Sequence, residues 1–290
     1  MIAIDALTYT YPGASEQTLH GLSFAIEDQE IFGFLGPSGA GKSTTQKILI
    51  GLLTGYHGTI QVMGRELRDW SHDYYEHVGV SFELPNHHTR LTARENLQHF
   101  GALYSGPIAD PMEVLTWVGL AEDADKRVSD FSKGMNIRLN VARSLMHRPR
   151  LLFLDEPTSG LDPVNASHMK DLIRRVRDQG TTVFITTHDM NVADQLCDRV
   201  AFITRGHIRL IDAPATLKQS YGRRCVSVVY TKEEGSTQDP LHTAEFPLDN
   251  LADNQAFFDI LKHHRIETMH TQETTLEGVF IEVTGEELTP

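Results

Sequence analysis

The chain has 290 residues and 40% hydrophobic content, which is ordinary for a globular protein with a sizeable core. Its 26 basic and 39 acidic residues give a net charge of −13, which argues against general binding of nucleic acid or anionic lipid. No apolar run approaches the roughly 20 residues of a membrane-spanning helix, the N-terminus does not resemble a secretion signal, and two isolated cysteines, Cys197 and Cys225, fit a reducing cytosol.

The first third of the chain alternates short apolar runs with turn signals, a pattern that predicts strands. Helical spacing then takes over between Thr92 and His147, where Thr92 and Glu95 form a capping-box pattern at the start of one helix. We interpret this stretch as an inserted helical lobe. The predicted strands before it are residues 7–11, 21–28, 30–36, 59–64 and 77–83.

Strands and helices alternate again after the lobe. A helix beginning at Pro163 and closed by Gly180 follows one buried run and precedes others, which predicts an α/β core with much parallel sheet. The predicted strands are residues 150–155, 181–187, 199–204 and 207–212.

The organisation changes near residue 220. Two strands joined by a polar loop, then short helices at 254–264 and 274–285, predict a small α+β extension over residues 220–290. It contains five basic and thirteen acidic residues, so it is an unfavourable surface for nucleic acid. We expect one domain over residues 1–219, with its helical lobe at about 86–147, and the extension as an accessory domain.

A glycine-rich stretch, GPSGAGKSTT, lies between an apolar run and a predicted helix and has the spacing G-x-x-x-x-G-K-[ST]. Gly36, Gly39 and Gly41 allow backbone conformations that a Cβ would obstruct, so backbone N–H groups can converge on phosphate oxygens. Lys42 can reach the β- and γ-phosphates of a nucleotide, and the Ser43 hydroxyl can ligate Mg²⁺. A flexible turn alone would not explain Lys42 and Ser43 at these offsets.

An acid pair follows the buried run 151–154 in RLLFLDEP. Ligands of parallel sheets bind at the carboxyl ends of the strands, so Asp155 is expected on the Mg²⁺ side and Glu156 is expected to polarise the attacking water. An acidic turn before Pro157 is the plainer interpretation. However, two carboxylates directly after four buried residues are costly without cationic partners.

These motifs together resemble the ATP-binding subunit of an ABC transporter. GPSGAGKST is similar to the Walker A motif, LLFLDEPTSGLDP to Walker B with the D-loop, FSKGMNIRLNVARSL to the family signature and its helix, and TTHD to the switch-histidine segment. They occur in the family's order over roughly residues 1–215. The resemblance implies a P-loop NTPase core with an antiparallel β subdomain and an inserted helical subdomain, plus the α+β extension.

The resemblance further implies a homodimer, head to tail, with two ATP molecules between the subunits. Ser132 and Gly134 of one chain would face the γ-phosphate held by the other, and Asp162 would bridge the dimer near Ser159. Tyr11 matches the aromatic that stacks on adenine, although a lone tyrosine is more often simply packed.

The predicted roles fall into three groups. The catalytic residues are Glu156, His188 and Lys42. The residues that bind the cofactor ATP are Tyr11, Gly36, Pro37, Ser38, Gly39, Ala40, Gly41, Lys42, Ser43, Thr44, Glu83, Ser132, Gly134 and Asp162. The Mg²⁺ ligands are Ser43, Asp155 and Glu83.

Two positions depart from the family pattern. The signature reads FSKGM where the familiar form is LSGGQ, so Lys133 either adds a charge near ATP or points into solvent. Glu83 stands where the family usually has a glutamine that links Mg²⁺ and the attacking water to the membrane subunit. We expect Glu83 to retain that sensing role, with an ordinary loop glutamate as the alternative.

The expected function is therefore an ATPase that powers transport, with export favoured by the C-terminal resemblance, through a separate transmembrane permease. The chain would lie in the cytoplasm, peripheral to the inner face of the cell membrane. The alternative is a soluble ABC-type ATPase acting on ribosomes or DNA, which the single core and the acidic charge disfavour. A non-hydrolytic regulator is disfavoured by Lys42, Asp155 and Glu156 occurring together with His188. The cargo and the role of the extension, whether stabilising, regulatory or passive, are not encoded in the motifs.

Overall fold

A computed structural model describes residues 1–221, 225–231, 241–272 and 274–286. The chain forms two compact units, one built on Met1–Pro214 and the other on Ala215–Gly285. The predicted domain boundary at residues 219 and 220 falls inside helix α7 (Pro214–Tyr221), and it stays a prediction. The polar loop predicted between the two strands of the extension lies, at 232–240, outside the described residues.

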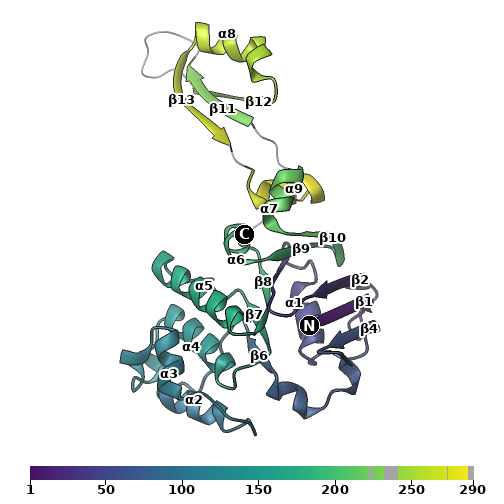
Figure 1. The fold of residues 1–290 in the computed structure, drawn as a ribbon, viewed down its shortest axis with the longest axis vertical. Helices are drawn as coiled ribbons and strands as arrows, with labels where there is room; N and C mark the ends of the chain where they lie inside the picture. The colour runs from purple at the N-terminus through teal and green to yellow at the C-terminus, as the bar shows by residue number, and fades with distance from the viewer. Residues whose placement is uncertain (222–224, 232–240, 273, 287–290) are drawn as a thin grey trace. The chain divides into compact units, whose positions relative to one another are not determined.

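A six-stranded sheet forms the centre of the first unit (Figure 1). All neighbouring strands are parallel except the edge pair β10 and β9. Every residue of β8 is buried, as a strand covered on both faces requires. In sheet order the strands are β10 (His207–Asp212), β9 (Arg199–Thr204), β3 (Ile31–Leu35), β8 (Thr182–Thr187), β7 (Leu151–Asp155) and β6 (Val78–Ser81). The α/β core predicted from the sequence is confirmed.

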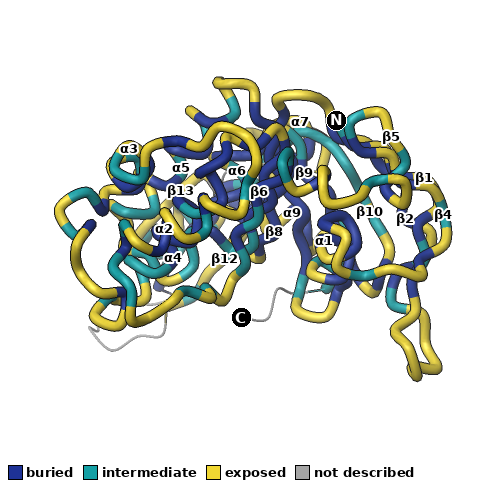
Figure 2. The backbone as a smooth tube through the Cα atoms, turned by 90° about the horizontal axis from the view of Figure 1, so that it is seen from below, coloured by how far each residue is buried: buried dark blue, intermediate teal, exposed yellow. Residues whose placement is uncertain are grey.

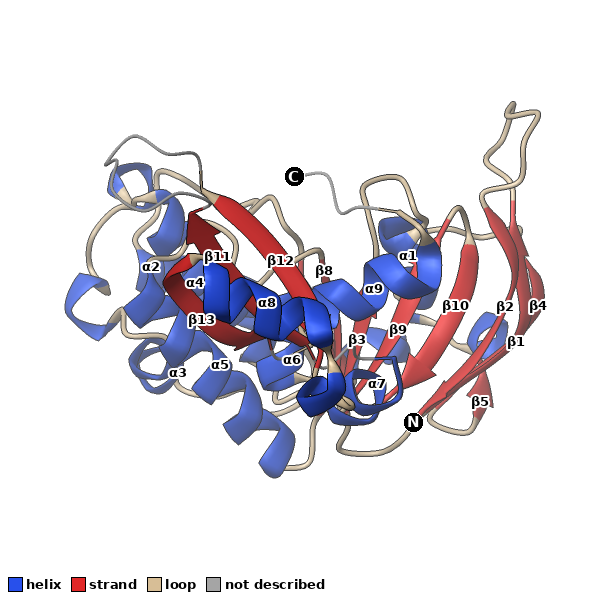
Figure 3. Ribbon diagram, turned by 90° about the horizontal axis from the view of Figure 1, so that it is seen from above, coloured by secondary structure: helices blue, strands red, loops and turns tan. Residues whose placement is uncertain are grey.

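Helices cover both faces of this sheet. Helices α1 and α5 both pack on β8, and Figures 1 and 3 show them on opposite faces. Figure 2 shows the central strands as the continuous buried part of the tube, with exposed loops around them. The covering helices are α1 (Lys42–Leu49), α5 (Pro163–Asp178) and α6 (Met190–Leu196).

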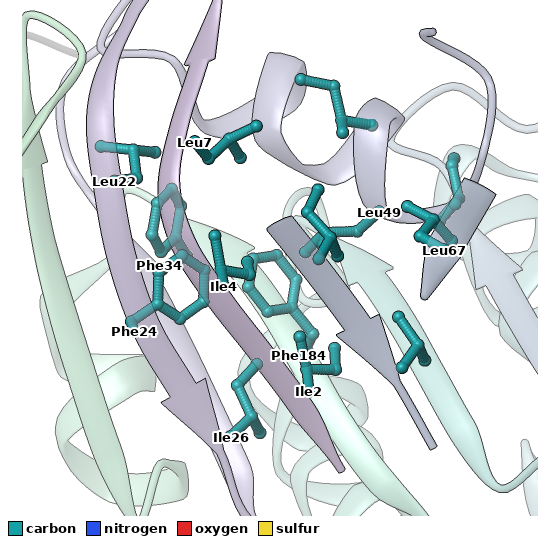
Figure 4. Close-up of a cluster of buried hydrophobic side chains, with 14 of the residues drawn as sticks. Ile2, Ile4, Leu7, Leu22, Phe24, Ile26, Phe34, Leu49, Leu67 and Phe184 are labelled. Atoms are coloured by element: carbon teal, nitrogen blue, oxygen red, sulfur yellow. The ribbon is translucent and has the colours of Figure 1, made fainter. Parts of the chain in front are cut away.

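An antiparallel sheet, in the order β2, β1, β4, β5, packs beside the parallel sheet. The Phe24 ring stacks on Phe32 and Phe34, with centroids 5.5 Å apart in both pairs, and joins the two sheets in one apolar cluster (Figure 4). The first strand begins at Ile2 rather than at the predicted residue 7, because a bulge at Ala6 (φ 50°) interrupts its alternation. The strands are β1 (Ile2–Tyr9), β2 (Leu19–Ile26), β4 (His57–Val62) and β5 (Arg65–Glu66).

The helical lobe contains three α-helices: α2 (Ala93–Gly101), α3 (Pro111–Trp117) and α4 (Lys133–Leu145). The predicted capping box is confirmed, because Thr92 Oγ1 accepts from the Glu95 N–H while the Glu95 carboxylate accepts from the Thr92 N–H. Helix α4 packs on β6, so the lobe and the sheet share a core at this edge.

The second unit contains an antiparallel sheet in the order β12, β11, β13. Val226, Val228, Phe246 and Phe257 form its buried core, with α8 supplying Phe257. Strand β13 was not predicted from the sequence, because RIETMHTQ carries few apolar residues. The elements are β11 (Cys225–Thr231), β12 (His242–Pro247), β13 (Arg265–Gln272), α8 (Gln255–His263) and α9 (Leu276–Thr284).

Candidate functional site

Three neighbouring strands end at the same edge of the parallel sheet, and each is followed by a predicted site segment. In the register of the sheet, Leu35 of β3 lies opposite Thr187, and Asp155 of β7 lies opposite Thr186. Parallel strands present their carboxyl ends together, so the glycine loop, the acid pair and His188 converge at this edge.

The glycine loop connects β3 to α1 with little room for side chains. A Cβ on Gly36 would lie 2.1 Å from the carbonyl oxygen of Ile203, and Gly41 (φ 108°) is the N-cap of α1. Gly39 also has a left-handed backbone (φ 79°). The first turn of α1 contains no acidic residue, so its N-terminal N–H groups and dipole remain available to an anion. The intervening Pro37, Ser38 and Ala40 lie in the loop, and Ser43 and Thr44 in the first turn of α1.

The Lys42 ammonium folds back over the loop. Its Nζ donates to the carbonyl oxygens of Gly36, at 2.6 Å, and Pro37, at 3.0 Å. Burial lowers the pKa of Lys42, while the negative charges of Glu156, Asp155 and Glu83 oppose that shift. Three predicted acidic residues therefore act electrostatically on the lysine of the loop.

Glu156 is held from two directions at the end of β7. Its Oε2 accepts from the Thr187 hydroxyl at 2.9 Å. Its Oε1 accepts from the backbone N–H of His188 at 2.9 Å and lies 2.6 Å from His188 Nδ1. The Glu156 side chain is 10% exposed, whereas the His188 side chain is 54% exposed. Glu156 also has a left-handed backbone conformation (φ 48°), which turns the chain out of the extended path of β7 directly after Asp155.

The hydroxyls that hold these acids were not identified in the sequence. Thr186 Oγ1 donates to Asp155 Oδ1, and it also lies 3.3 Å from Oε1 of the buried Gln46 in α1. The sequence does contain these two threonines, as the last residues of the predicted strand 181–187, directly before His188. Their contact with the acid pair depends on β8 lying beside β7, and the sequence alone does not give the order of the strands in the sheet.

Tyr11 lies near the same loop. Its hydroxyl is 3.0 Å from Thr44 Oγ1, and its ring packs edge-on against Tyr9 with centroids 5.0 Å apart. The side chain is 37% exposed. The tyrosine is thus anchored to α1 at its hydroxyl and keeps part of its ring accessible.

The signature segment begins α4. Ser132 is the N-cap and its Oγ accepts from the Met135 N–H at 3.2 Å. A Cβ on Gly134 would lie 3.3 Å from Leu161, and a Cβ on Gly160 would lie 3.0 Å from Cε of Lys133. The Lys133 side chain therefore lies along Gly160 of the D-loop while the residue remains exposed, and a charge near ATP stays a prediction.

The D-loop leads directly into α5. Asp162 is the N-cap of this helix and accepts from the N–H groups of Val164 and Asn165. A hydrogen bond from the Asn165 side chain is the largest cause that lowers the pKa of Asp162, and the two backbone N–H groups lower it further. Asp162 is therefore ionised and exposed, and it is oriented by its own helix.

Glu83 lies in the exposed segment after β6. That segment is fixed by side chains of α4: Asn140 Nδ2 donates to the Phe82 carbonyl at 2.7 Å, and Arg143 Nη1 donates to the Asn86 carbonyl at 2.9 Å. The Glu83 carboxylate itself stays exposed. These two anchors were not predicted from the sequence, and they tie the backbone on either side of Glu83 to α4 of the lobe.

The oxygen donors at this edge fit Mg²⁺. The Ser43 hydroxyl and the carboxylates of Asp155 and Glu83 are hard ligands of the kind that magnesium prefers. Within the described ranges, no group of three His, Cys, Asp or Glu side chains is arranged to hold a metal alone. Such an arrangement suits an ion that takes its remaining ligands from a nucleotide's phosphates and from water.

The inserted lobe distinguishes this chain from P-loop NTPases in general, and fold and site together define an ATP-binding cassette. A family model described as ABC transporter matches residues 19–159, and one described as fluoroquinolone efflux ABC transporter C-terminal domain matches residues 224–273. The chain belongs to the fluoroquinolone-export family of ABC transporter ATP-binding proteins. It is 53% identical to the fluoroquinolones export ATP-binding protein of Mycobacterium tuberculosis strain H37Rv, over 100% of this chain and 95% of that protein.

More distant relatives share the cassette. The linearmycin resistance ATP-binding protein LnrL of Bacillus subtilis is 31% identical, with 92% of this chain and 94% of that protein covered. The dimeric cassette MJ0796, solved in a post-hydrolysis state with ADP and phosphate, is 26% identical with a TM-score of 0.67, covering 73% of this chain and 98% of that one. CbiO1 of Clostridium perfringens, part of the transporter complex cbiONQ, is 25% identical with a TM-score of 0.66, covering 76% and 91%.

The predicted class is therefore confirmed: the chain is an ATP-binding and ATP-hydrolysing subunit of an export ABC transporter. Cassettes of this kind bind adenine nucleotide, dimerise and pair with transmembrane components. Among the helices of the described residues, none has both the length and the apolar character needed to cross a bilayer.

Proposed function

We propose that this chain, as a homodimer on the inner face of the cell membrane, powers export of fluoroquinolone-type compounds through a separate permease. The observation that carries the proposal is the 53% identity to a fluoroquinolones export ATP-binding protein over the whole chain. The match of residues 224–273 to the C-terminal domain of fluoroquinolone efflux transporters supports it independently of the cassette motifs. We also assign residues 220–290 as an accessory domain of this exporter.

ATP binds, in this proposal, at the glycine loop. The β- and γ-phosphates displace the carbonyl contacts of Lys42, whose ammonium then pairs with phosphate oxygens. Residues 36–44 enclose the phosphates through their backbone N–H groups, and the partly exposed ring of Tyr11 stacks on adenine. Bound Mg²⁺, held by Ser43, Asp155 and Glu83, supplies charge neutralisation to the phosphates.

Glu156 orients and polarises the attacking water in hydrolysis. Its Oε2 is fixed by Thr187, while Oε1 is shared with His188. The exposed His188 ring can turn from Glu156 to the γ-phosphate when nucleotide is present, so that Oε1 keeps its bond to the His188 N–H and has a second lone pair available for the water. In this proposal, the 2.6 Å contact between Glu156 Oε1 and His188 Nδ1 is the arrangement of the two side chains before nucleotide binds.

A second copy completes the site. Ser132, Gly134 and Asp162 lie at the N-terminal ends of α4 and α5, where each helix has the positive end of its dipole. They would face nucleotide bound by the partner's glycine loop. Because ATP contacts both subunits, the closed dimer is favoured while ATP is bound, and hydrolysis followed by release of the products favours the open one.

The permease binds next to Glu83. A groove of about 520 Å³ is lined by β6, α4, the end of α2 with the residues after it, and the segment before β6, including Tyr75, Val80, Phe100 and Arg143. Arg143 also donates to the Asn86 carbonyl, which connects the groove to the Glu83 segment. Leu84 is 82% exposed and Leu103 is 70% exposed, which is costly for apolar side chains that remain in water. A helix or loop of the permease with an apolar anchor suits this groove, and its position lets Glu83 report on Mg²⁺.

The proposal is tested by expressing the chain with the membrane protein encoded beside it in a drug-sensitive host. Intrinsic drug fluorescence then measures the accumulation of a fluoroquinolone in the cells. We expect lower accumulation with the wild-type pair and none of this reduction with Lys42→Ala. Unchanged fluoroquinolone accumulation together with reduced accumulation of another compound class would reject the substrate, and co-purification with ribosomes instead of the membrane protein would reject the transport role.

A further inference from the structure

Gln46 is a buried polar residue to which no motif assigns a role. It lies in α1, four residues after Lys42, and is 2% exposed. Its Oε1 faces Thr186 Oγ1 at 3.3 Å, and its Nε2 is buried without a hydrogen-bond partner in the described part of the chain. A buried donor without an acceptor is costly, so this arrangement of the amide needs an explanation.

Thr186 cannot donate a hydrogen bond to every acceptor around it. Its hydroxyl has one proton and three acceptors in reach: Asp155 Oδ1, Gln46 Oε1 at 3.3 Å and the Leu154 carbonyl at 3.4 Å. The carboxylate is both the nearest and the charged acceptor, so it receives the proton. Gln46 Oε1 would then meet a second oxygen with no proton between them. A half-turn of the amide places Nε2 against Thr186 instead and gives the orphaned donor its acceptor.

The next residue of β8 already has such an arrangement. The Asp189 N–H donates to Thr187 Oγ1 at 3.0 Å, and the same hydroxyl donates to Glu156 Oε2 at 2.9 Å. A donor behind the hydroxyl therefore commits its proton to the acid. Gln46 stands in the equivalent place behind Thr186.

The geometry points to a hydrogen-bond relay, Gln46 Nε2–H to Thr186 Oγ1–H to Asp155 Oδ1, in which Gln46 and Thr186 are positioning residues for the metal-side carboxylate. The relay rests on the proposed role of Asp155 toward Mg²⁺. With Oδ1 committed to Thr186, Oδ2 is the oxygen presented to the cation. Because Gln46 belongs to the same helix as Ser43, the relay also fixes the spacing between the two proposed ligands.

Four variants separate the relay from general packing. Thr186→Val removes the hydroxyl at constant shape, and Thr186→Ser restores it. Gln46→Met removes the amide with little change in volume. Thr182→Val is the matched control, because Thr182 is a buried threonine at the other end of β8 whose hydroxyl accepts from the Gln29 N–H.

Two binding measurements on the purified full-length chain report on the relay. Mn²⁺, used as the probe, is titrated by electron paramagnetic resonance in the presence of ATP, and a fluorescent ATP analogue is titrated in EDTA. We expect Thr186→Val to weaken Mn²⁺ binding about tenfold, the scale of one hydrogen bond to a charged group, while metal-free nucleotide affinity changes less than about twofold. Thr186→Ser and Thr182→Val should bind Mn²⁺ as the wild type does.

The coupling between the two positions gives the decisive result. Gln46→Met should weaken Mn²⁺ binding about threefold, because Thr186 can then turn to the Leu154 carbonyl, and the double variant should bind no more weakly than Thr186→Val alone. Additive losses, or equal losses in both titrations, overturn the relay. Asp155→Asn distinguishes the two levels of failure: if it leaves Mn²⁺ binding intact, the proposed role of Asp155 is wrong, whereas if it alone impairs binding, only the relay is wrong.

Discussion

The groups at the ends of the parallel strands and the groups at the start of the signature and D-loop helices are organised in opposite ways. Asp155 and Glu156 accept hydrogen bonds from side chains or backbone of the neighbouring strand and the segment after it, and the Glu156 side chain is 10% exposed. Within the part of the chain that the structure describes, the side chains of Ser132 and Asp162 bond only to their own helices, and both residues are exposed. The acids are therefore placed by tertiary structure, and the helix ends are placed by local capping.

This difference indicates which parts of the proposed ATPase cycle a single chain is organised for before it meets a second copy. Strand register and buried hydroxyls hold the acids in place within one subunit, so the proposed chemistry of hydrolysis would be preorganised there. The helix ends need only a correct local fold, and their proposed ligand belongs to the second copy. Substitutions at the strand ends should impair hydrolysis within the assembled dimer, whereas those at the helix ends should alter assembly.

The largest effect is expected at Glu156. Glu156→Gln keeps the shape and the hydrogen bond to Thr187 but removes the charge that polarises water, so kcat should fall about 100- to 10,000-fold. Nucleotide affinity should be nearly unchanged, and the variant should accumulate as an ATP-bound dimer. Phosphate release and size-exclusion chromatography measure these quantities.

Glu95→Gln is the control for the Glu156 experiment, because this exposed glutamate caps α2 in the lobe, away from the strand ends. It should hydrolyse ATP at the wild-type rate. Normal turnover in Glu156→Gln would show that Glu156 is not the base. The strand-end acids would then not differ from the helix-end groups in their part in catalysis.

The second effect is the loss of nucleotide binding in Lys42→Ala. This change removes a charged donor from the loop, and charge-assisted bonds of this kind are worth about 1.5–3 kcal/mol, which corresponds to roughly 10- to 100-fold in affinity. Titration with a fluorescent ATP analogue measures it. Lys47→Ala, an exposed lysine one turn further along α1, should bind normally; equal losses in both variants would mean that general charge, rather than position in the loop, determines binding.

Much of the strand-end region could be predicted from the sequence. The glycine spacing, the acid pair after a buried run and the histidine after another are local patterns, and the parallel-sheet rule brings their strand ends to one edge. The roles of Thr186 and Gln46 could not be predicted, because they depend on β8 lying beside β7 and on α1 packing on β8. Thr186 is 31 residues from Asp155 along the chain and 140 residues from Gln46.

In the lobe, a local feature was predicted from the sequence and a contact between distant segments was not. The capping box of α2 was predicted because it depends on residues three apart, and the structure confirms it. The path of Lys133 was not predicted, because the helix start alone does not reveal that the D-loop passes beside it. The strand β13 was missed for a related reason, since pairing with β11 stabilises a segment whose own apolar content is low.

The third prediction concerns the junction between lobe and sheet, where His147 Nε2 donates to the Val78 carbonyl and the ring stacks on Tyr104 at 3.9 Å. Burial lowers the pKa of His147 from 6.5 to about 4. Below pH 6.5 the unfolded chain binds a proton that the folded chain refuses, so this contribution to stability is complete above pH 6.5 and declines toward pH 4. Between pH 7 and pH 5 the loss should be about 1–2 kcal/mol.

Urea unfolding at the two pH values measures this loss. His147→Phe keeps the stacked ring and removes the titrating group, so its stability should change less between pH 7 and pH 5 than that of the wild type. His99→Phe, at an exposed position on α2, should keep the wild-type difference. If His147→Phe also keeps it, the pH dependence arises elsewhere, for example at His87, whose pKa burial likewise lowers to about 4.

The smallest effect is expected at Lys133, and it tests whether the helix-end region is purely local. The Lys133 stem lies along Gly160, so its methylenes brace the D-loop that ends in the Asp162 cap. Lys133→Met keeps this stem without the charge and should hydrolyse ATP within about twofold of the wild type, whereas Lys133→Ala should lose a few-fold in kcat with little change in KM, in keeping with a loss below about 1 kcal/mol. The dependence of ATPase rate on protein concentration measures assembly in the same samples. Wild-type rates in both variants would show that the brace has no function. Equal losses in both would instead assign the effect to the ammonium group, which would place a cation at the proposed γ-phosphate face and make the two regions electrostatically alike.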